Sequence, residues 1–341
     1  DTKNQSDENP NDPLYDKSGR VTEYYDTGWE SVDLKIGNEV FLGNPDLSLF
    51  MGYHFSHYSL QTRQFNSNDF TSSSKDSFRN SSGGDTDIHG FFTQVSWNLY
   101  QNWSATLGGR QERWTSYNGF KDSGSGPNNH PDRDESKFSP KFSLKYYPLP
   151  LWTLQFSLAK AYRFPVVEEL FNNIASQNSS SLSDADLKPE NGFHKTLLLK
   201  KEIDQGTVQL TFFEDDIKDV IFNQQDATTL ISTVLNIDNV RTRGIEFSLS
   251  KRGVFTSNLD INFNISFMNS KILENERLPS SVGNRLPRVP NSRLNMFSTY
   301  HINPQLDASL GLRYAGSSYN TIPNDDKKDG FGSQSDFFVI D

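Results

Sequence analysis

The stretch SNLDINFNISFMN, residues 257–269, carries the clearest structural signal in the chain. Apolar residues occupy every second position, and polar residues fill the positions between them. An alternation with period two predicts a β-strand with one apolar face and one polar face. The apolar set is Leu259, Ile261, Phe263, Ile265 and Phe267, and the polar set is Asp260, Asn262, Asn264 and Ser266.

Similar strands recur along the chain in pairs joined by short turns. The turns fall near residues 44, 100, 149, 204, 253 and 303, a spacing of about fifty residues. A long polar connection follows each pair, and these connections span residues 61–87, 115–136, 164–189, 223–237, 272–289 and 317–333. We therefore expect about thirteen antiparallel strands of about ten residues, with all short turns at one end and all long loops at the other.

The alternation alone does not separate a β-sandwich from a membrane barrel, because antiparallel sheets commonly have one solvated face. Strands of about nine to eleven residues match a tilted membrane span. A strict alternation of short turns at one end and long loops at the other is typical of outer-membrane β-barrels. Aromatic residues near strand ends are typical of them as well. Those residues are Tyr146, Tyr147, Trp152, Tyr162, Tyr300 and Tyr314. A β-propeller fits less well, because each blade needs four short strands and each unit here offers two long ones.

Composition agrees with a single architecture that has a polar second face. The 341 residues show no composition shift that would mark a linker, and only 34% of them are hydrophobic. A net charge of -10 argues against a nucleic-acid partner, which would require a basic stripe. The absence of cysteine excludes disulfides and thiolate chemistry. The sequence contains no run of about 18 apolar residues, so it predicts no membrane-spanning helix.

The segment AKAYRFPVVEELFNNIASQNSSSLSDADLKPE, residues 159–190, connects two of these strands. Pro165 lacks a backbone N–H, so strand pairing should stop at Phe164. The residues VVEELFNN can form about one helical turn, and the Asn- and Ser-rich run after them predicts a solvated loop.

At AYRFPVVEELF and DADLKPE the sequence resembles the TonB-dependent receptors, large outer-membrane barrels that import iron chelates and other scarce nutrients. The resemblance covers most of residues 87–341. It continues through GGRQERW, KFSPKFSLKYYP, TFFEDDIKDVI, NIDNVRTRGIEFSLSK, GNRLPRVPNSRLN and LRYAGSSY. No single motif is specific, but their order and spacing together identify the family.

The resemblance implies an all-β, antiparallel transmembrane barrel of about 22 strands preceded by a plug domain. Residues 1–341 would then be a partial barrel domain that lacks the plug, the early strands and the last strands. The implied partners are outer-membrane lipid, a ferric chelate and the TonB-ExbB-ExbD complex, the last contacted through the missing N-terminal region. A ferric siderophore is the expected ligand, and the alternatives are cobalamin, another metal chelate, a glycan, or passive diffusion through a porin.

Candidate site residues follow from strand parity and from the loops. Glu246 has the parity opposite to Ile245 and Phe247 and should face the lumen. The expected lumen-wall residues are Arg110, Arg163, Glu246 and Arg313. The resemblance implies that Glu246 pairs with the plug, and the three arginines either contact the plug or attract an acidic ferric chelate. The aromatic loop residues expected to stack on a ligand are Trp114, Tyr117, Phe164, Phe171, Phe222 and Tyr319. For any one of these aromatic residues, anchoring at the membrane interface is an alternative role.

Other chemistry has little support in the sequence. The six histidines are scattered, and the pair His54 and His57 is too slight for a metal site. Haem is disfavoured, because residues 165–187 lack the histidine that haem receptors of the family carry there. The acidic run at residues 214–216 resembles a solvated strand end, and no nucleophile and base occur in a convincing pattern. We therefore expect neither an enzyme nor a bound cofactor.

Overall fold

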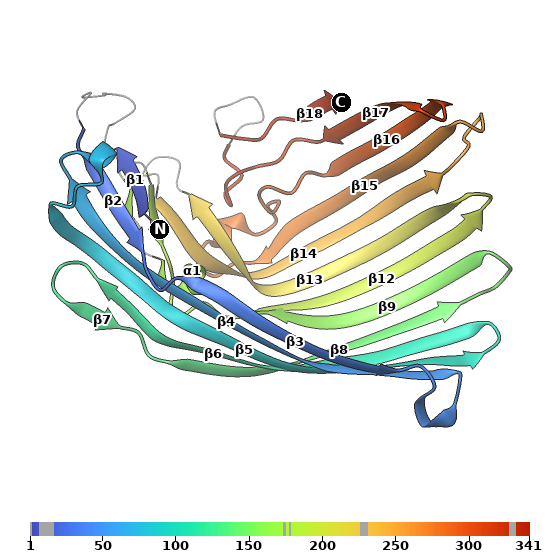
Figure 1. Ribbon diagram of the computed structural model, residues 1–341, viewed down its shortest axis with the longest axis horizontal. Helices are drawn as coiled ribbons and strands as arrows, with labels where there is room; N and C mark the ends of the chain where they lie inside the picture. Colours follow the sequence, from blue (N-terminus) through green and yellow to red (C-terminus); the bar gives the residue numbers. More distant parts are fainter. Residues whose placement is uncertain (1, 7–16, 173–174, 177–178, 226–230, 327–331) are drawn as a thin grey trace.

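The computed structural model is a single β-sheet that curves into a deep trough (Figure 1). The structure describes residues 2–6, 17–172, 175–176, 179–225, 231–326 and 332–341. Among them, no helix is both long enough and apolar enough to cross a membrane. One short α-helix, α1 (Val167–Phe171), and three 3-10 turns, η1 (Phe41–Gly43), η2 (Phe70–Ser72) and η3 (Pro279–Ser281), interrupt the strands.

The strands are β1 (Thr2–Ser6), β2 (Gly19–Tyr24), β3 (Gly28–Asn38), β4 (Leu47–Ser67), β5 (Ser77–Tyr100), β6 (Trp103–Asp122), β7 (Pro127–Asn129), β8 (Arg133–Tyr146), β9 (Trp152–Arg163), β10 (Ala175–Ser176), β11 (Ser179–Leu182), β12 (Glu190–Ile203), β13 (Gly206–Gln225), β14 (Ile231–Lys251), β15 (Leu259–Glu274), β16 (Ser292–Asn303), β17 (Leu306–Ala315) and β18 (Phe337–Ile340).

Thirteen of the described strands form an antiparallel meander in which each pairs with the next. They are β3, β4, β5, β6, β8, β9, β12, β13, β14, β15, β16, β17 and β18. The tight turns between paired strands gather at one end of the trough and the long connections at the other (Figure 1). The predicted strand number and the predicted separation of turns and loops are both confirmed.

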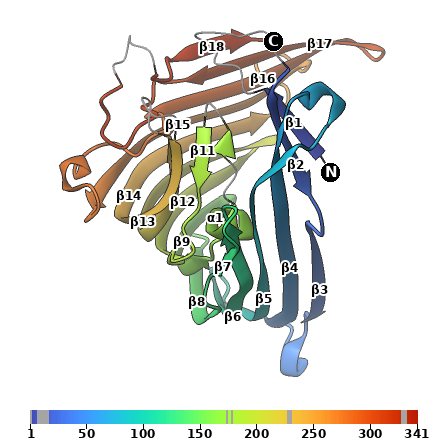
Figure 2. The same ribbon diagram turned by 90° about the vertical axis from the view of Figure 1, so that its left-hand side faces the viewer.

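The sheet does not close on itself. Strand β3 pairs with β4 at one edge of the meander, and β18 pairs with β17 at the other. Seen from the side, the wall therefore encloses a wide interior that remains open between its two edges (Figure 2). Helix α1 and the short strand β11 lie inside this concavity (Figure 2). We call the concave side the inner face and the convex side the outer face.

Several connections predicted to be loops continue as strands. Strand β4 runs to Ser67 and β5 starts at Ser77, although residues 61–87 look like loop in sequence. Similarly, β6 reaches Asp122 and β13 reaches Gln225. The predicted bounds of these three loops are therefore too wide, because backbone pairing does not require apolar side chains. Strand preference depends on the surroundings, so the alternation fades where neither face is buried in an apolar medium.

The hydrogen-bond register separates the two faces. Leu199, Leu210, Phe247 and Ile265 occupy one row across β12 to β15 on the outer face. One residue away from each of these positions lies an inner row made of Lys200, Gln209, Ser248 and Asn264. The alternation that predicts strand 257–269 thus reflects an apolar outer face and a polar inner face.

Aromatic side chains lie at the ends of the apolar outer surface. The rings of Trp103 and Tyr146 stack beside the tight turns with centroids 4.3 Å apart and planes 24° apart. The Lys201 ammonium lies 4.9 Å from the centre of the Trp152 ring at the same end. Rings with an apolar body and a polar or cationic edge suit the boundary between hydrocarbon and water.

We expect Leu210→Arg to lower the free energy of unfolding in a bilayer by about 2–4 kcal/mol, because it places a charge in the middle of the outer apolar rows. Gln209→Arg, one residue away on the inner face, is the matched control and should change it by less than about 1 kcal/mol. Urea unfolding of the full-length protein in lipid vesicles measures both values. Equal losses would contradict the assignment of the two faces.

Candidate functional site

A buried apolar cluster lines the inner face near the long loops. Trp114 of β6 stacks on Phe164, with ring centroids 5.7 Å apart and planes 8° apart. Helix α1 adds Val167, Leu170 and Phe171. Wall strands and the end of the 164–189 connection supply the other members, Leu60, Leu187, Ile221 and Val234. The helical turn predicted in VVEELFNN therefore exists, and its apolar side fastens the connection to the wall.

The Phe171 ring occupies a socket made by two glycines. A Cβ atom on either Gly84 of β5 or Gly119 of β6 would overlap this ring. The ring of His130 lies 5.8 Å from it on a further side. Glycine is required at both positions because it leaves room for the ring close to the backbone.

An ion pair fixes the start of the same segment. Arg163 donates from both terminal nitrogens to the Glu169 carboxylate, at 2.7 and 2.9 Å. The same carboxylate accepts the backbone N–H of Val166 at 2.9 Å. Burial raises the pKa of Glu169, although the hydrogen bond from Val166 and the charge of Arg163 act in the opposite direction. Arg163 also lies 3.5 Å from Glu190, which joins the segment to β12.

The structure places four of the predicted site residues in contacts within the chain. Trp114, Phe164 and Phe171 are only 0%, 5% and 2% exposed, so in this structure their rings cannot stack on a ligand. Arg163 is committed to two carboxylates of its own chain. The aromatic residues are covered because Pro165 turns the chain inward, and the short helix then places its apolar side on the wall.

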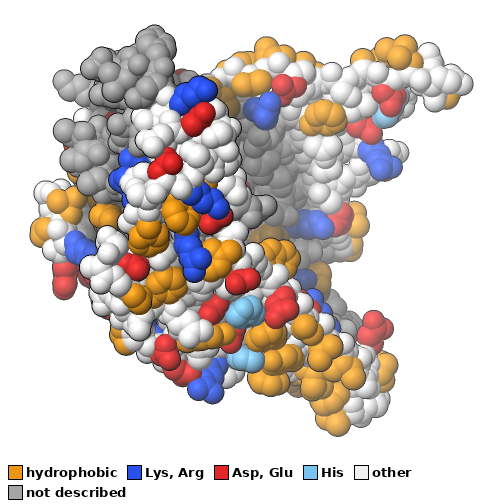
Figure 3. Space-filling model, turned by 60° about the vertical axis from the view of Figure 1, so that its left-hand side comes forward, with side chains coloured by type: hydrophobic (Ala, Val, Ile, Leu, Met, Phe, Trp, Pro, Cys, Tyr) orange, Lys and Arg blue, Asp and Glu red, His pale blue; other side chains and the backbone are white. Residues whose placement is uncertain are grey.

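Tyr117, predicted to stack on a ligand from a loop, lies on the outer face of β6. Its hydroxyl donates to Asp87 at 3.1 Å, and the other oxygen of Asp87 is 2.7 Å from Nδ1 of His57. Histidine and acidic side chains border a hydrophobic area of the surface in Figure 3.

The two remaining aromatic candidates each lie under an arginine. The guanidinium carbon of Arg288 is 5.3 Å from the centre of the Phe222 ring. That of Arg285 is 5.6 Å from the centre of the Tyr319 ring. Such contacts hold a guanidinium over an aromatic face while its N–H groups remain free to donate.

Two long loops clamp each other to position these arginines. The backbone N–H of Arg288 donates to the Tyr319 carbonyl at 2.6 Å. The Asn324 amide bonds both the N–H and the carbonyl of Arg285, at 2.8 and 3.0 Å. Arg288 has a φ of 63°, a left-handed conformation that is uncommon for residues other than glycine. The clamp between the loops compensates for that strain.

A cavity of about 540 Å³ opens on the inner face beside these loops. Arg293 of β16 and Arg313 of β17 project from the wall into it, and Arg288 approaches from the loop. Within the described residues, neither Arg288 nor Arg293 has a carboxylate partner, and Arg313 pairs with exposed Asp341 at 2.8 Å. Asn295, Gln334, Ser335 and Phe337 are among the other residues that line it. We call this space the arginine cavity.

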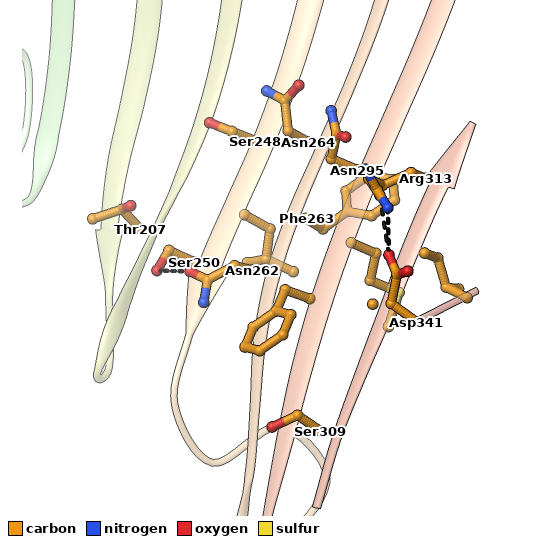
Figure 4. A pocket seen from close by; sticks show the side chains of 15 residues that line it. Thr207, Ser248, Ser250, Asn262, Phe263, Asn264, Asn295, Ser309, Arg313 and Asp341 are labelled. Atoms are coloured by element: carbon orange, nitrogen blue, oxygen red, sulfur yellow. Dashed lines mark hydrogen bonds and ion pairs between the residues drawn. The ribbon is translucent and has the colours of Figure 1, made fainter. Parts of the chain in front are cut away.

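A second cavity of about 640 Å³ follows along the inner face toward the tight turns (Figure 4). Arg313 and Asn295 line both cavities, so the two adjoin. Its polar side chains come from successive strands, and they are Thr207, Ser248, Ser250, Asn262, Asn264, Ser309 and Asp341. Hydroxyls and amides of this kind can exchange hydrogen bonds with a solute that moves past them.

The other predicted wall residues lie on the inner face as expected. Arg110 donates to Glu112 at 2.7 Å and lies 5.9 Å from the Phe92 ring. Glu246 faces Thr211 and Ser266 of the neighbouring strands and has no ion-pair partner among the described residues. Contact of these residues with a plug stays a prediction.

Sequence reasoning placed Arg313, Phe222 and Tyr319 in the site but missed Arg288 and Arg293. Both lie in GNRLPRVPNSRLN, a segment that supports the family resemblance but carries no separate sign of a binding site. Parity shows that Arg293 shares a face with Asn295, because the two are separated by one residue. The position of Arg288 depends on a contact between two loops, so no pattern in the neighbouring residues predicts it.

The histidine and acidic side chains of the described part of the chain are spread over separate contacts. No group of three or more metal-binding side chains occurs among those residues. His54 and His57 have separate carboxylate partners, Asp33 at 3.0 Å and Asp87 at 2.7 Å, and they face opposite sides of β4. The acidic residues Glu214 and Asp216 take part in ion pairs on the outer face.

An antiparallel wall with apolar outer rows, a polar inner face and tight turns at one end defines the β-barrel class of outer-membrane proteins. The family model for "TonB dependent receptor-like, beta-barrel" matches residues 1–341. The chain therefore belongs to the TonB-dependent receptor family and is an outer-membrane protein.

Curated and solved relatives agree with this family. The iron-regulated outer membrane virulence protein of Vibrio cholerae is 23% identical over 339 residues, which cover 95% of this chain and 46% of the relative. The ferric yersiniabactin uptake receptor FyuA from Yersinia pestis superimposes with a TM-score of 0.67 at 15% identity, over 95% of this chain and 46% of that chain. The ferric citrate transporter FecA gives 0.68 at 14% identity, over 96% and 48%. The chain thus spans about half the length of these relatives.

The glycine socket gives a testable prediction about the 164–189 connection. The chain has no cysteine, so Leu170→Cys, at a position 1% exposed, introduces a thiol that should react slowly with a maleimide. Gly84→Ala should expel Phe171 and speed that reaction at least about tenfold. Val166→Cys, at a position 42% exposed, is the control and should react fast with or without Gly84→Ala. An unchanged rate at position 170 would contradict the socket.

Proposed function

We propose that the protein is part of a receptor that binds an anionic ferric chelate, most specifically a ferric siderophore, and imports it with energy from the TonB complex. The observation that carries this proposal is the arginine cavity, where Arg288, Arg293 and Arg313 converge on the inner face. The iron-regulated relative and the ferric-chelate transporters of similar fold support the same ligand class.

Charge explains why an anion would be held there. Two of the three guanidinium groups lack a carboxylate partner among the described residues, and the third pairs with an aspartate that is itself 56% exposed. Exposed ion pairs contribute little, so a ligand can replace Asp341 at small cost. Planar guanidinium groups bind carboxylate-type oxygens in pairs, which suits the oxygen-rich edge of an iron chelate.

The second cavity supports transport beyond capture. Its amide and hydroxyl side chains carry no net charge except at the shared Arg313 and at Asp341. A ligand released by the arginines would meet weaker and more numerous partners as it moves toward the tight turns. The proposed role needs no covalent step, so the protein would supply binding and a gated passage only.

Other ligands remain alternatives within the same family. One solved neighbour is the copper transporter OprC, which superimposes with a TM-score of 0.64 at 15% identity. Cobalamin, a second type of metal chelate or a glycan would be imported by the same energy-coupled route. A passive porin is the alternative outside energy-coupled transport, and it predicts entry of small solutes without TonB.

Uptake by whole cells tests the proposed function. Cells that express the full-length receptor should accumulate a radiolabelled ferric siderophore only when TonB is present. Accumulation of small sugars and amino acids at the same rate without TonB would instead indicate a porin. Energy-coupled uptake of a different ligand, with none of the tested iron chelates, would overturn the ligand class and retain the transport route.

The double variant Arg288→Gln, Arg293→Gln should weaken binding of an anionic ferric chelate at least about tenfold, because each change removes charge-assisted hydrogen bonds. Arg113→Gln is the matched control, since Arg113 is also an exposed arginine but lies on the outer face and pairs with Asp134 at 2.6 Å. Calorimetry with the purified full-length receptor measures the affinities. Equal affinity of the double variant and the control would refute the assignment of the arginine cavity.

A further inference from the structure

The outer face of β9 to β15 changes abruptly from apolar to charged along the strands. One row across these five strands is Phe156, Leu197, Phe212, Ile245 and Phe267. Four of its five side chains are more than 40% exposed, as expected for a surface that meets lipid tails. The next two rows toward the long loops contain most of the charged residues on this side of the wall.

The register defines both charged rows. The first is Leu158, Lys195, Glu214, Arg243 and Asn269. The second is Lys160, Phe193, Asp216, Arg241 and Lys271. They hold five cations and two carboxylates, which leaves an excess of three positive charges. We call these two rows the basic patch.

The carboxylates orient the central cations and leave the outermost ones free. Glu214 accepts from Lys195 at 2.6 Å and also pairs with Arg243. Asp216 accepts from Nε of Arg241 at 2.8 Å. At the two ends of the patch, Lys160 lies 5.1 Å from the Tyr162 ring, and Lys271 has no ion-pair partner among the described residues.

The other side of the wall has the opposite charge just beyond its own apolar rows. The row across β3 to β8 is Glu30, His57, Asp87, Thr115 and Asp134. It holds three carboxylates and one histidine. The excess of cations is therefore a local property of the face from β9 to β15 and does not follow from a general enrichment of basic residues at the boundary.

We propose that the basic patch binds the phosphate-bearing headgroup of a lipid in the external leaflet of the outer membrane. Its position, directly beyond the apolar rows on the side of the long loops, is where lipid headgroups meet the barrel. Basic side chains at this level attract anionic headgroups, and arginine binds phosphate through two parallel hydrogen bonds. Phe193, 41% exposed between the cations, adds an apolar contact for the top of an acyl chain.

The geometry also explains why carboxylates lie within a site for an anion. Side chains of Arg241, Arg243 and Lys195 would otherwise repel one another and spread apart. Glu214 and Asp216 offset this repulsion by pairing with all three, and the Arg243 side chain remains 62% exposed. An acidic protein partner would need to approach through the lipid layer, so the headgroup is the occupant that the position favours.

Binding of a phosphorylated glycolipid to the full-length receptor in detergent tests the proposal. The probes are lipid A with both phosphates and the same lipid after enzymatic removal of its phosphates, measured by native mass spectrometry. The phosphorylated lipid should bind at least about tenfold more tightly. The double variant Lys160→Gln, Lys271→Gln, which breaks no ion pair in the described part of the chain, should lose at least about tenfold in affinity for it.

The matched control is the double variant Lys201→Gln, Lys251→Gln, which removes two cations from the outer face outside the patch, breaks no ion pair among the described residues and should keep wild-type affinity. Heat-dependent gel mobility checks that each variant is folded. Equal binding of the two lipids by the wild type would overturn the proposal without any variant. Equal losses in the patch variant and the control would overturn the assignment to this patch.

Discussion

The hydrogen-bond register between neighbouring antiparallel strands is the constraint on which the rest of the structure depends. Successive side chains alternate between faces, so a slip by one residue in any pair would move its apolar set into the lumen. Across β9 to β15 the pairing keeps Leu154, Leu199, Leu210, Phe247 and Ile265 in one outer row. The same ladder satisfies the backbone groups, which hydrocarbon cannot do.

Because the outer face meets lipid, the inner face is free to carry polar and charged groups. Two devices then organise the end with the long loops. The apolar cluster around Trp114 fastens the 164–189 connection to the wall. Bonds from Asn324 to Arg285 and from Arg288 to Tyr319 join the two loops beside the cavity that Arg288 and Arg293 line. Both devices join segments far apart in sequence, so the loops form a defined surface beside the arginine cavity. The proposed ligand site therefore depends on loop packing as much as on strand parity.

The strands, their order and their two faces can be predicted from the sequence, because the alternation in stretches such as 257–269 is local. Pro165 likewise marks the end of β9 at Arg163, within two residues. The extension of β4 and β5 beyond the apolar rows cannot be predicted from the sequence, because polar residues can pair as strands without any alternation. The burial of Phe171 between two glycines and the arginine over Phe222 are contacts between distant segments. For that reason the aromatic ligand residues are the least reliable part of the prediction, whereas Arg313, placed by parity, lies where expected.

Spin labels introduced one at a time from Val208 to Asp216 of β13, in the full-length receptor in vesicles, would test the register most directly. Accessibility to oxygen should be high at 208, 210 and 212 and low at 209, 211 and 213, because only the first set faces lipid. Labels at 214 and 216 should instead be accessible to a water-soluble nickel chelate, because the charged rows begin there. Absence of the alternation, or oxygen-accessible labels at 214 and 216, would contradict the proposed wall.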